Sequence, residues 1–229
     1  MKRAIQILML SLIMVIGLRG TVYAVHVTAS SWTSTTTYDA QARINTPFYP
    51  ITYFPSWSCN YTMITDGTPN QRYAQVGWSK DDDLYGRTLN GTYYFFQYNN
   101  SMATPYNIFS TVGPAVGSTH TYITMLDGST YYGTVDGSTI GSHNAGFTGN
   151  YAQYSGEVSD EGNARFAGSS TNKLFMFNIY SAYMNNGTKI WTLSPPLDFV
   201  NESKQGFLYE GSWVVGSPNA SFSYYDKRN

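Results

Sequence analysis

An amide and a carboxylate, Gln75 and Glu157, are the side chains in this sequence that could do chemistry as a pair. Both belong to short runs rich in Tyr and β-branched residues. A carboxylate can act as general base on a water molecule, and an amide N–H can stabilise the oxyanion that forms when that water attacks a carbonyl. If the two side chains share one site, their types predict hydrolytic chemistry.

Sharing a site requires that both side chains project from suitable strand faces. Side chains alternate along a strand, so Gln75 projects from the face opposite to the apolar set that ends in Trp78. The same alternation places Glu157 on the side of Gln153 and away from Val158. If the two polar faces line one concave sheet, the amide and the carboxylate meet across a groove walled by Tyr and Phe. Burial in such a groove would raise the carboxylate pKa.

Other familiar catalytic patterns do not occur in the sequence. It has no Gly-x-Ser-x-Gly elbow, no His-Glu-x-x-His pair, no phosphate-binding loop and no pair of cysteines. His26, His120 and His143 are scattered, and we interpret each as structural or solvent-facing. The acidic run 81–83 is typical of a solvated turn rather than a calcium loop. We therefore expect neither a metal nor a cofactor.

The elements that would position Gln75 and Glu157 are strands bounded by Gly, Asn, Asp or Pro. The strongest strand signals cover Tyr73–Trp78, Thr92–Tyr98, His120–Leu126, Thr130–Val135, Tyr151–Val158 and Leu174–Tyr180. Two Asp-Gly pairs, Asp127-Gly128 and Asp136-Gly137, predict hairpin turns because these residues tolerate a positive φ. Antiparallel pairing of neighbouring runs follows.

The spacing of these signals predicts one all-β domain over residues 25–229. No window has a sustained 3.6-residue apolar period, and turns recur about every 8 to 15 residues, as in an antiparallel β-sandwich of the jelly-roll or concanavalin-like kind. The Ser- and Thr-rich stretch Val25–Thr37 is expected to be an introductory segment or a first edge strand. Two aromatic runs, Ser212–Val215 and Ser221–Tyr225, are expected to close one sheet.

The first 24 residues predict export. Lys2 and Arg3 precede an apolar run, and small residues before Ala24 suit a signal peptidase, so cleavage is expected after Ala24. The mature protein is then secreted, with no stable membrane insertion. Cys59 is the single cysteine of the chain, which rules out an intrachain disulfide.

The charge balance argues against nucleic acid as a partner. The chain has 13 Lys and Arg against 14 Asp and Glu, a formal net charge of -1. Nucleic-acid binding depends on a surplus of basic residues that neutralise phosphates, and this chain has none.

Four segments in order, Thr62–Gly67, Ala74–Gly77, Tyr93–Tyr98 and Ser155–Val158, resemble the glutamic peptidases of the eqolisin type. Those are secreted acid endopeptidases with a concanavalin-like β-sandwich and a catalytic Gln and Glu. The resemblance covers roughly residues 62–160. It implies that Gln75 and Glu157 are the catalytic pair, Gln75 stabilising the oxyanion and Glu157 acting on the water.

The resemblance also implies a set of substrate-binding residues. Asp66 matches an Asp of a preceding loop, whereas Phe95 and Gln97 stand where the family has Trp and Glu. Tyr73 lies on the same strand face as Gln75, and Gln153 lies on the same strand face as Glu157, so we add both to the expected set. The expected substrate-binding residues are Asp66, Tyr73, Phe95, Gln97 and Gln153. A polypeptide is the substrate that this interpretation predicts.

Other interpretations of the same residues stay open. Gln75 and Glu157 can instead belong to a hydrogen-bond network that fixes strand register without catalysis. Concanavalin-like sandwiches also bind glycans on exposed aromatic faces, which makes a non-catalytic, lectin-like protein the alternative function. A cell-surface structural protein whose strand edges pair with neighbours is the remaining possibility.

Overall fold

The computed structural model describes residues 25–48, 57–67, 72–81, 92–100, 105–158, 164–193, 197–201, 209–214 and 221–226. The expected signal peptide, residues 1–24, lies outside them. The regular elements within these ranges are strands, which confirms the all-β class. Their bounds are β1 (Val25–Asn45), β2 (Trp57–Thr65), β3 (Tyr73–Asp81), β4 (Thr92–Asn99), β5 (Tyr106–Phe109), β6 (Thr119–Asp127), β7 (Thr130–Val135), β8 (Ser138–Asn144), β9 (Gly149–Val158), β10 (Leu174–Asn185), β11 (Thr188–Leu193), β12 (Leu197–Asn201), β13 (Tyr209–Val214) and β14 (Ser221–Asp226).

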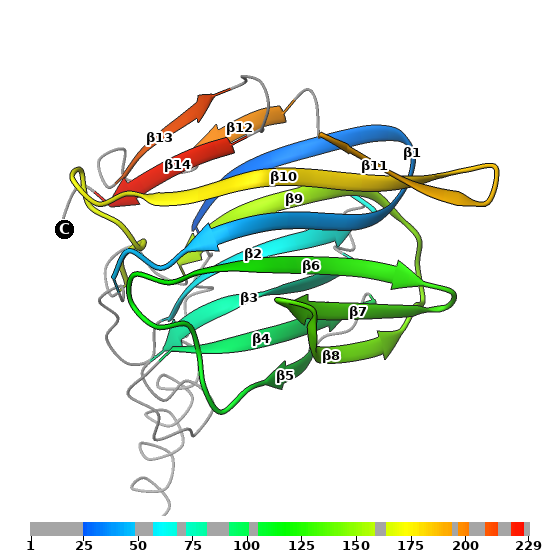
Figure 1. Cartoon of the computed structure of the whole chain (residues 1–229), viewed down its shortest axis with the longest axis horizontal. Coiled ribbons are helices and arrows are strands. Elements are labelled where there is room, and N and C mark those ends of the chain that lie inside the picture. Colours follow the sequence, from blue (N-terminus) through cyan, green and yellow to red (C-terminus); the bar gives the residue numbers. More distant parts are fainter. Residues whose placement is uncertain are drawn as a thin grey trace, which may run out of the picture.

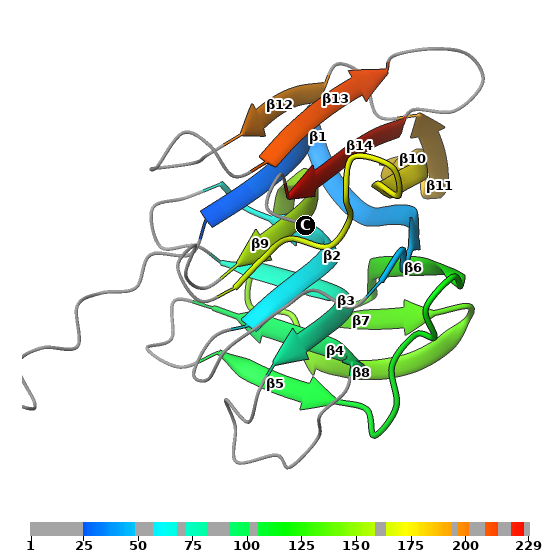
Figure 2. The same ribbon diagram turned by 90° about the vertical axis from the view of Figure 1, so that its left-hand side faces the viewer.

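The strands form one antiparallel sheet that folds over on itself. Its main path runs β13-β14-β10-β1-β9-β2-β3-β4-β5, and β6, β7 and β8 branch from β1. The β6–β7–β8 branch packs over β2, β3 and β4, so the two parts make the layers of a sandwich (Figures 1 and 2). The described part of the chain contains no apolar helix of the length that a membrane crossing requires.

The β1 strand connects the two layers. Its first half pairs with β9 on one side and β12 on the other, and residues from Asp39 onward pair with both β6 and β10 in the other layer. The expectation of an introductory segment or an edge strand is therefore wrong. The stretch has no readable alternation because its pairing partners change between Trp32 and Thr37, where the register shifts.

A core of aromatic and aliphatic side chains fills the space between the layers. Even-numbered residues of β2, β3, β4 and β9 point into it, and among them Trp78, Phe96 and Tyr154 are fully buried. On the β7 side, a Cβ at Gly133 would lie 2.6 Å from the Phe96 ring. Glycine at this position lets the layers approach closely. The odd-numbered side chains of the same four strands must face the opposite way.

The strand signals located most of the central sheet. All six predicted central runs are strands, and the two predicted tail strands correspond to β13 and β14. Both Asp-Gly pairs lie at hairpins, and φ angles of 48° at Asp136 and 82° at Gly137 are those of a type I′ turn. A third hairpin turn of this kind, Asn186-Gly187 between β10 and β11, was not predicted. Nor were β2, β5, β8, β11 and β12.

Candidate functional site

The odd-numbered side chains of β2, β3, β4 and β9 form a second face, directed away from the core. We call it the amide face. Its apolar part is a separate cluster of buried side chains that includes Tyr61, Tyr93 and Phe95. The strand pairings place its residues in levels that run across the strands, so each level contains one residue from each strand.

One level of this face consists almost entirely of amides. Gln75 on β3 lies opposite Met63 on β2 and Gln97 on β4. Met63 in turn lies opposite Gln153 on β9, and Gln97 lies opposite Asn107 on β5. These five residues, which we call the amide row, come from five adjacent strands and carry no ionisable group.

Hydrogen bonds join the side chains near the middle of the amide row. Gln75 Nε2 donates to Gln97 Oε1 over 2.6 Å, and the Tyr73 hydroxyl donates to the same oxygen over 3.0 Å. Gln75 is only 5% exposed, whereas Tyr73, Gln97 and Gln153 are half-buried. The Gln75 amide is thus directed toward β4, and Gln97 and Gln153, the latter at the β9 end of the row, are partly exposed.

The next level of the face is aromatic and closely packed. Tyr61 on β2 lies opposite Gly77 on β3, and Phe95 on β4 lies opposite Gly77 from the other side. The rings of Tyr61 and Phe95 meet edge to face with centroids 6.4 Å apart. Phe95, expected to bind substrate, is 4% exposed and serves to pack this level.

Glu157 lies one level further along, beyond the aromatic level. Its Oε2 accepts a hydrogen bond from the Tyr61 hydroxyl over 3.0 Å, and it is half-buried. Burial raises the pKa of the Tyr61 hydroxyl well above its usual value, and the charge of Glu157 raises it further. The same two causes raise the pKa of the buried Cys59 thiol, which lies opposite Glu157 on β2. Glu157 is therefore bonded to the buried Tyr61 hydroxyl and lies beside the buried Cys59 thiol.

The structure places Gln75 and Glu157 on one face, at different levels and on strands that are not neighbours. Gln75 is level with Gln153, four residues before Glu157 on β9 and two strands away. At about 3.3 Å per residue and about 4.8 Å per strand, their Cα atoms are about 16 Å apart. The side chain that the register brings level with Gln75 on β9 is Gln153.

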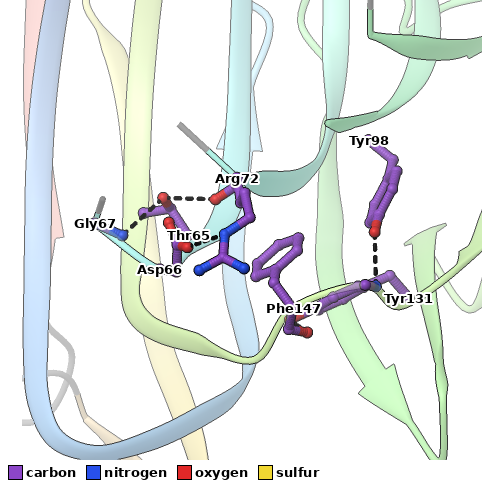
Figure 3. A network of polar contacts seen from close by, with 8 residues as sticks. Thr65, Asp66, Gly67, Arg72, Tyr98, Tyr131 and Phe147 are labelled. Atoms are coloured by element: carbon purple, nitrogen blue, oxygen red, sulfur yellow. Dashed lines mark hydrogen bonds and ion pairs between the residues drawn. The ribbon is translucent and has the colours of Figure 1, made fainter. Parts of the chain in front are cut away.

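Asp66 is held at the end of β2 by an ion pair with Arg72 (Figure 3). Arg72 Nε donates to Asp66 Oδ2, and the backbone N–H of Asp66 donates to the Arg72 carbonyl over 3.2 Å. Thr65 completes this connection by donating its hydroxyl to the same carbonyl over 2.9 Å. Burial, and to a lesser extent the charge of Asp66, raises the pKa of the core residue Tyr131. Asp66 thus fixes the β2–β3 connection beside the core, away from the amide row.

Sequence reasoning found four of the residues that matter here and missed others. Gln75, Gln97, Gln153 and Tyr73 all belong to the amide face or contact its amides. Met63, Asn107 and Tyr61 were missed because β2 and β5 were not predicted. Alternation within the run from Cys59 to Thr65 is the signal that could have revealed β2. Within the residues that the structure describes, no three His, Cys, Asp or Glu side chains are grouped to hold a metal ion.

Comparison with known proteins finds similarity in the fold. No family model matches the sequence, and no curated protein is similar to it. Among solved structures, scytalido-glutamic peptidase with a transition state analog inhibitor superposes with a TM-score of 0.59 at 13% identity, covering 90% of this chain and 100% of that one. SCP-B, an eqolisin peptidase in a complex with the tripeptide Ala-Ile-His, has a TM-score of 0.57 at 10% identity and the same coverage.

A looser likeness extends to glycoside hydrolases. The β-glucanase of Bacillus licheniformis has a TM-score of 0.40 at 10% identity, covering 88% of this chain and 77% of that one. The glutamic peptidases and this chain thus share a β-sandwich fold, which confirms the resemblance at the level of the fold. At identities this low, the likeness shows the fold alone.

Proposed function

We propose that this chain is an exported protein that binds an extended polypeptide across its amide face without cleaving it. The observation that carries the proposal is the amide row, five residues from five strands at one level. Five strands at about 4.8 Å spacing span about 19 Å, the length of about six extended residues. Export rests on the signal-peptide pattern of residues 1–24.

The chemistry of the row suits a peptide backbone. A side-chain amide offers both N–H donors and a carbonyl acceptor, so it can pair with the N–H and C=O groups of an extended chain. Gln97 Oε1 already accepts two hydrogen bonds, which leaves its amide nitrogen directed to other partners. The fold also supports a peptide ligand, because the similar glutamic peptidases are complexed with peptide-based molecules.

Hydrolysis is left out of the proposal because of where the carboxylate lies. A general base must reach the attacking water while the oxyanion donor contacts the same carbonyl. Glu157 is bonded to Tyr61 two levels from Gln75, and the position level with Gln75 on β9 is an amide, Gln153. An amide cannot take a proton from water.

The test measures binding of a fluorescently labelled, unfolded polypeptide by anisotropy at pH 7 and at pH 4. Gln153→Leu should weaken binding at least about tenfold, because Gln153 is a half-buried end of the row and its replacement keeps the volume. Gln41→Leu is the matched control, since Gln41 lies on β1 in the other layer. Equal binding by both variants and the wild type would overturn the proposal.

Two further outcomes identify the alternative functions. Glycan binding is favoured by two half-buried rings, Tyr73 and Tyr151, at the level next to the amide row. If a neutral β-glucan binds and Gln153→Leu abolishes that binding, the protein is lectin-like. If the unfolded polypeptide is cut at pH 3 to 5 and Glu157→Gln stops the cutting, the predicted peptidase replaces the binding protein.

A further inference from the structure

Three side chains at the start of β6 form a hydrogen-bonded chain that the amide face does not involve. Asp136 Oδ2 lies 2.6 Å from His120 Nδ1, and His120 Nε2 lies 2.9 Å from Ser118 Oγ. A carboxylate, an imidazole and a hydroxyl are thus in contact in the order that nucleophilic hydrolases use. We call these three residues the Ser118 cluster.

Two tight turns build the cluster. Ser118 closes a turn in which its N–H donates to the Ala115 carbonyl over 3.0 Å, and Gly117 has a φ of 83°, as the third residue of a type II turn requires. Ser118 and His120 are two residues apart where β6 begins, so they share one side of the chain. The type I′ turn after β7 brings Asp136 beside them.

Contacts from neighbouring residues hold the carboxylate and the ring in place. The Thr121 N–H donates to Asp136 Oδ1 over 2.8 Å, and the Asp136 N–H donates to the Thr121 carbonyl over 2.8 Å. Partial burial raises the pKa of Asp136, but the hydrogen bond from the Thr121 N–H and the nearby His120 outweigh it and hold the pKa below its usual value. The Tyr94 ring meets the His120 ring edge to face, with centroids 5.7 Å apart. Asp136 is therefore an ionised acceptor for the Nδ1 proton.

We propose that Ser118 is a nucleophile that takes the acyl group of small, uncharged carboxylic esters. When Nδ1–H donates to Asp136, the neutral imidazole has its lone pair on Nε2, which points at Ser118 Oγ. The Ser118 hydroxyl donates to the Ala115 carbonyl over 2.6 Å, and rotating only its hydrogen directs it to Nε2.

The reaction balances with water as the second substrate. Ser118 Oγ bonds to the ester carbonyl carbon while its proton passes to His120 Nε2, and the ester C–O bond breaks as that proton passes to the leaving alcohol. Water then attacks the acyl-serine, gives its proton to Nε2, and releases the carboxylic acid as Ser118 regains a proton.

The surroundings of the cluster indicate the substrate class. The loop that leads to Ser118 exposes two apolar side chains, Val112 at 67% and Val116 at 52%. The His120 side chain is 22% exposed and that of Asp136 is 52% exposed, so the cluster is open to solvent. An open site flanked by valines favours a short neutral acyl group over a charged or large one.

The first test uses p-nitrophenyl acetate as substrate and a fluorophosphonate as a covalent probe, with mass spectrometry to locate the label. The wild type should release p-nitrophenolate and take the label on Ser118. Ser118→Ala should take no label and should release p-nitrophenolate no faster than a sample without protein. Asp136→Asn should slow the release at least about tenfold, because Nδ1 loses its charged acceptor. Ser138→Ala, which changes an exposed serine in the turn next to Asp136, should behave as the wild type does.

A cysteine variant keeps the test decisive if Ser118→Ala fails to fold. Ser118→Cys should react with iodoacetamide at least about tenfold faster than Ser138→Cys, and adding His120→Gln should remove the difference. The native Cys59 is buried and does not compete for the reagent. The proposal is overturned if the wild type takes no label on Ser118, or if the two cysteines react at the same rate.

Discussion

The amide face and the Ser118 cluster place polar side chains in contact by opposite means. The face joins Gln75 and Gln97, 22 residues apart, and aligns them with Gln153 through the pairing of β9, β2, β3 and β4. The cluster is made by two turns, and its bonded side chains are 2 and 16 residues apart. The cluster thus joins an ionisable carboxylate and imidazole that are partly exposed, whereas the bonded amides of the face are neutral and Gln75 is nearly buried.

That difference follows from the cost of burying charge. An ionised group removed from water loses several kcal/mol of solvation unless it is fully paired, whereas an amide needs only its hydrogen-bond partners. Gln75 is nearly buried and is bonded to Gln97, but half of the Asp136 side chain remains in solvent. The face is therefore suited to binding, and the cluster is suited to proton transfer.

The largest expected effect is a loss of stability when a side chain is added at Gly77, on the amide face. A Cβ at Gly77 would meet the Asn60 carbonyl oxygen and lie 2.7 Å from Tyr61 Cβ. Gly77→Ala should lower the free energy of unfolding by about 3 kcal/mol, because backbone on β2 must move. Urea denaturation measures this as a lower midpoint. An unchanged midpoint would mean that β2 and β3 are not paired in this register.

How much of each region the sequence could predict follows from how the region is built. Alternation correctly placed Gln75 and Glu157 on strand faces, and the Asp136-Gly137 pair correctly predicted its hairpin. Strand register could not be predicted, because the pairing of strands far apart in the chain depends on both strands and cannot be read from the sequence of either one. The level of Glu157 relative to Gln75 depends on β2, which was not predicted.

The Ser118 cluster was missed for a different reason. His120 was interpreted as structural or solvent-facing because no carboxylate stands near it in the sequence. The β6–β7 and β7–β8 hairpins place the Asp136 carboxylate next to His120, and the Asp-Gly pairs predicted both hairpins. Following those two hairpins around to the start of β6 would have brought Asp136 next to His120.

The second prediction concerns the buried amide pair. Gln97→Leu should destabilise the protein by about 2 kcal/mol, because it removes the oxygen that accepts from both the nearly buried Gln75 amide and the Tyr73 hydroxyl. Gln75→Leu should cost less, about 1 kcal/mol, because Gln97 Oε1 keeps the Tyr73 hydroxyl as a donor. Chemical denaturation of the two variants and the wild type gives the three values. A Gln75 variant that is less stable than the Gln97 variant would show that Gln97 Oε1 is not the shared acceptor.

The third prediction applies the glycine test to the Ser118 cluster. Nothing lies within 4 Å of a Cβ built at Gly117, but its φ is 83°. Gly117→Ala should therefore cost about 1 kcal/mol through backbone conformation alone, less than Gly77→Ala. Thermal denaturation of both variants makes the comparison. If the Gly117 variant is the less stable, local turns matter more to this fold than strand pairing.

The smallest expected effect is a pH dependence that the Asp136 carboxylate has and the Gln75 amide lacks. The pKa of Asp136 in the folded protein lies below its ordinary value of 3.8. A lowered pKa contributes stability above pH 3.8, and that stability is lost as the pH falls through the folded-state value. Asp136→Asn should reduce the melting temperature at pH 6 and have less effect at pH 2. Gln75→Leu should reduce it equally at both, because an amide does not titrate. A variant of Asp136 with the same effect at both pH values would mean that the carboxylate is not held as an ionised acceptor, and the relay to Ser118 would lose its basis.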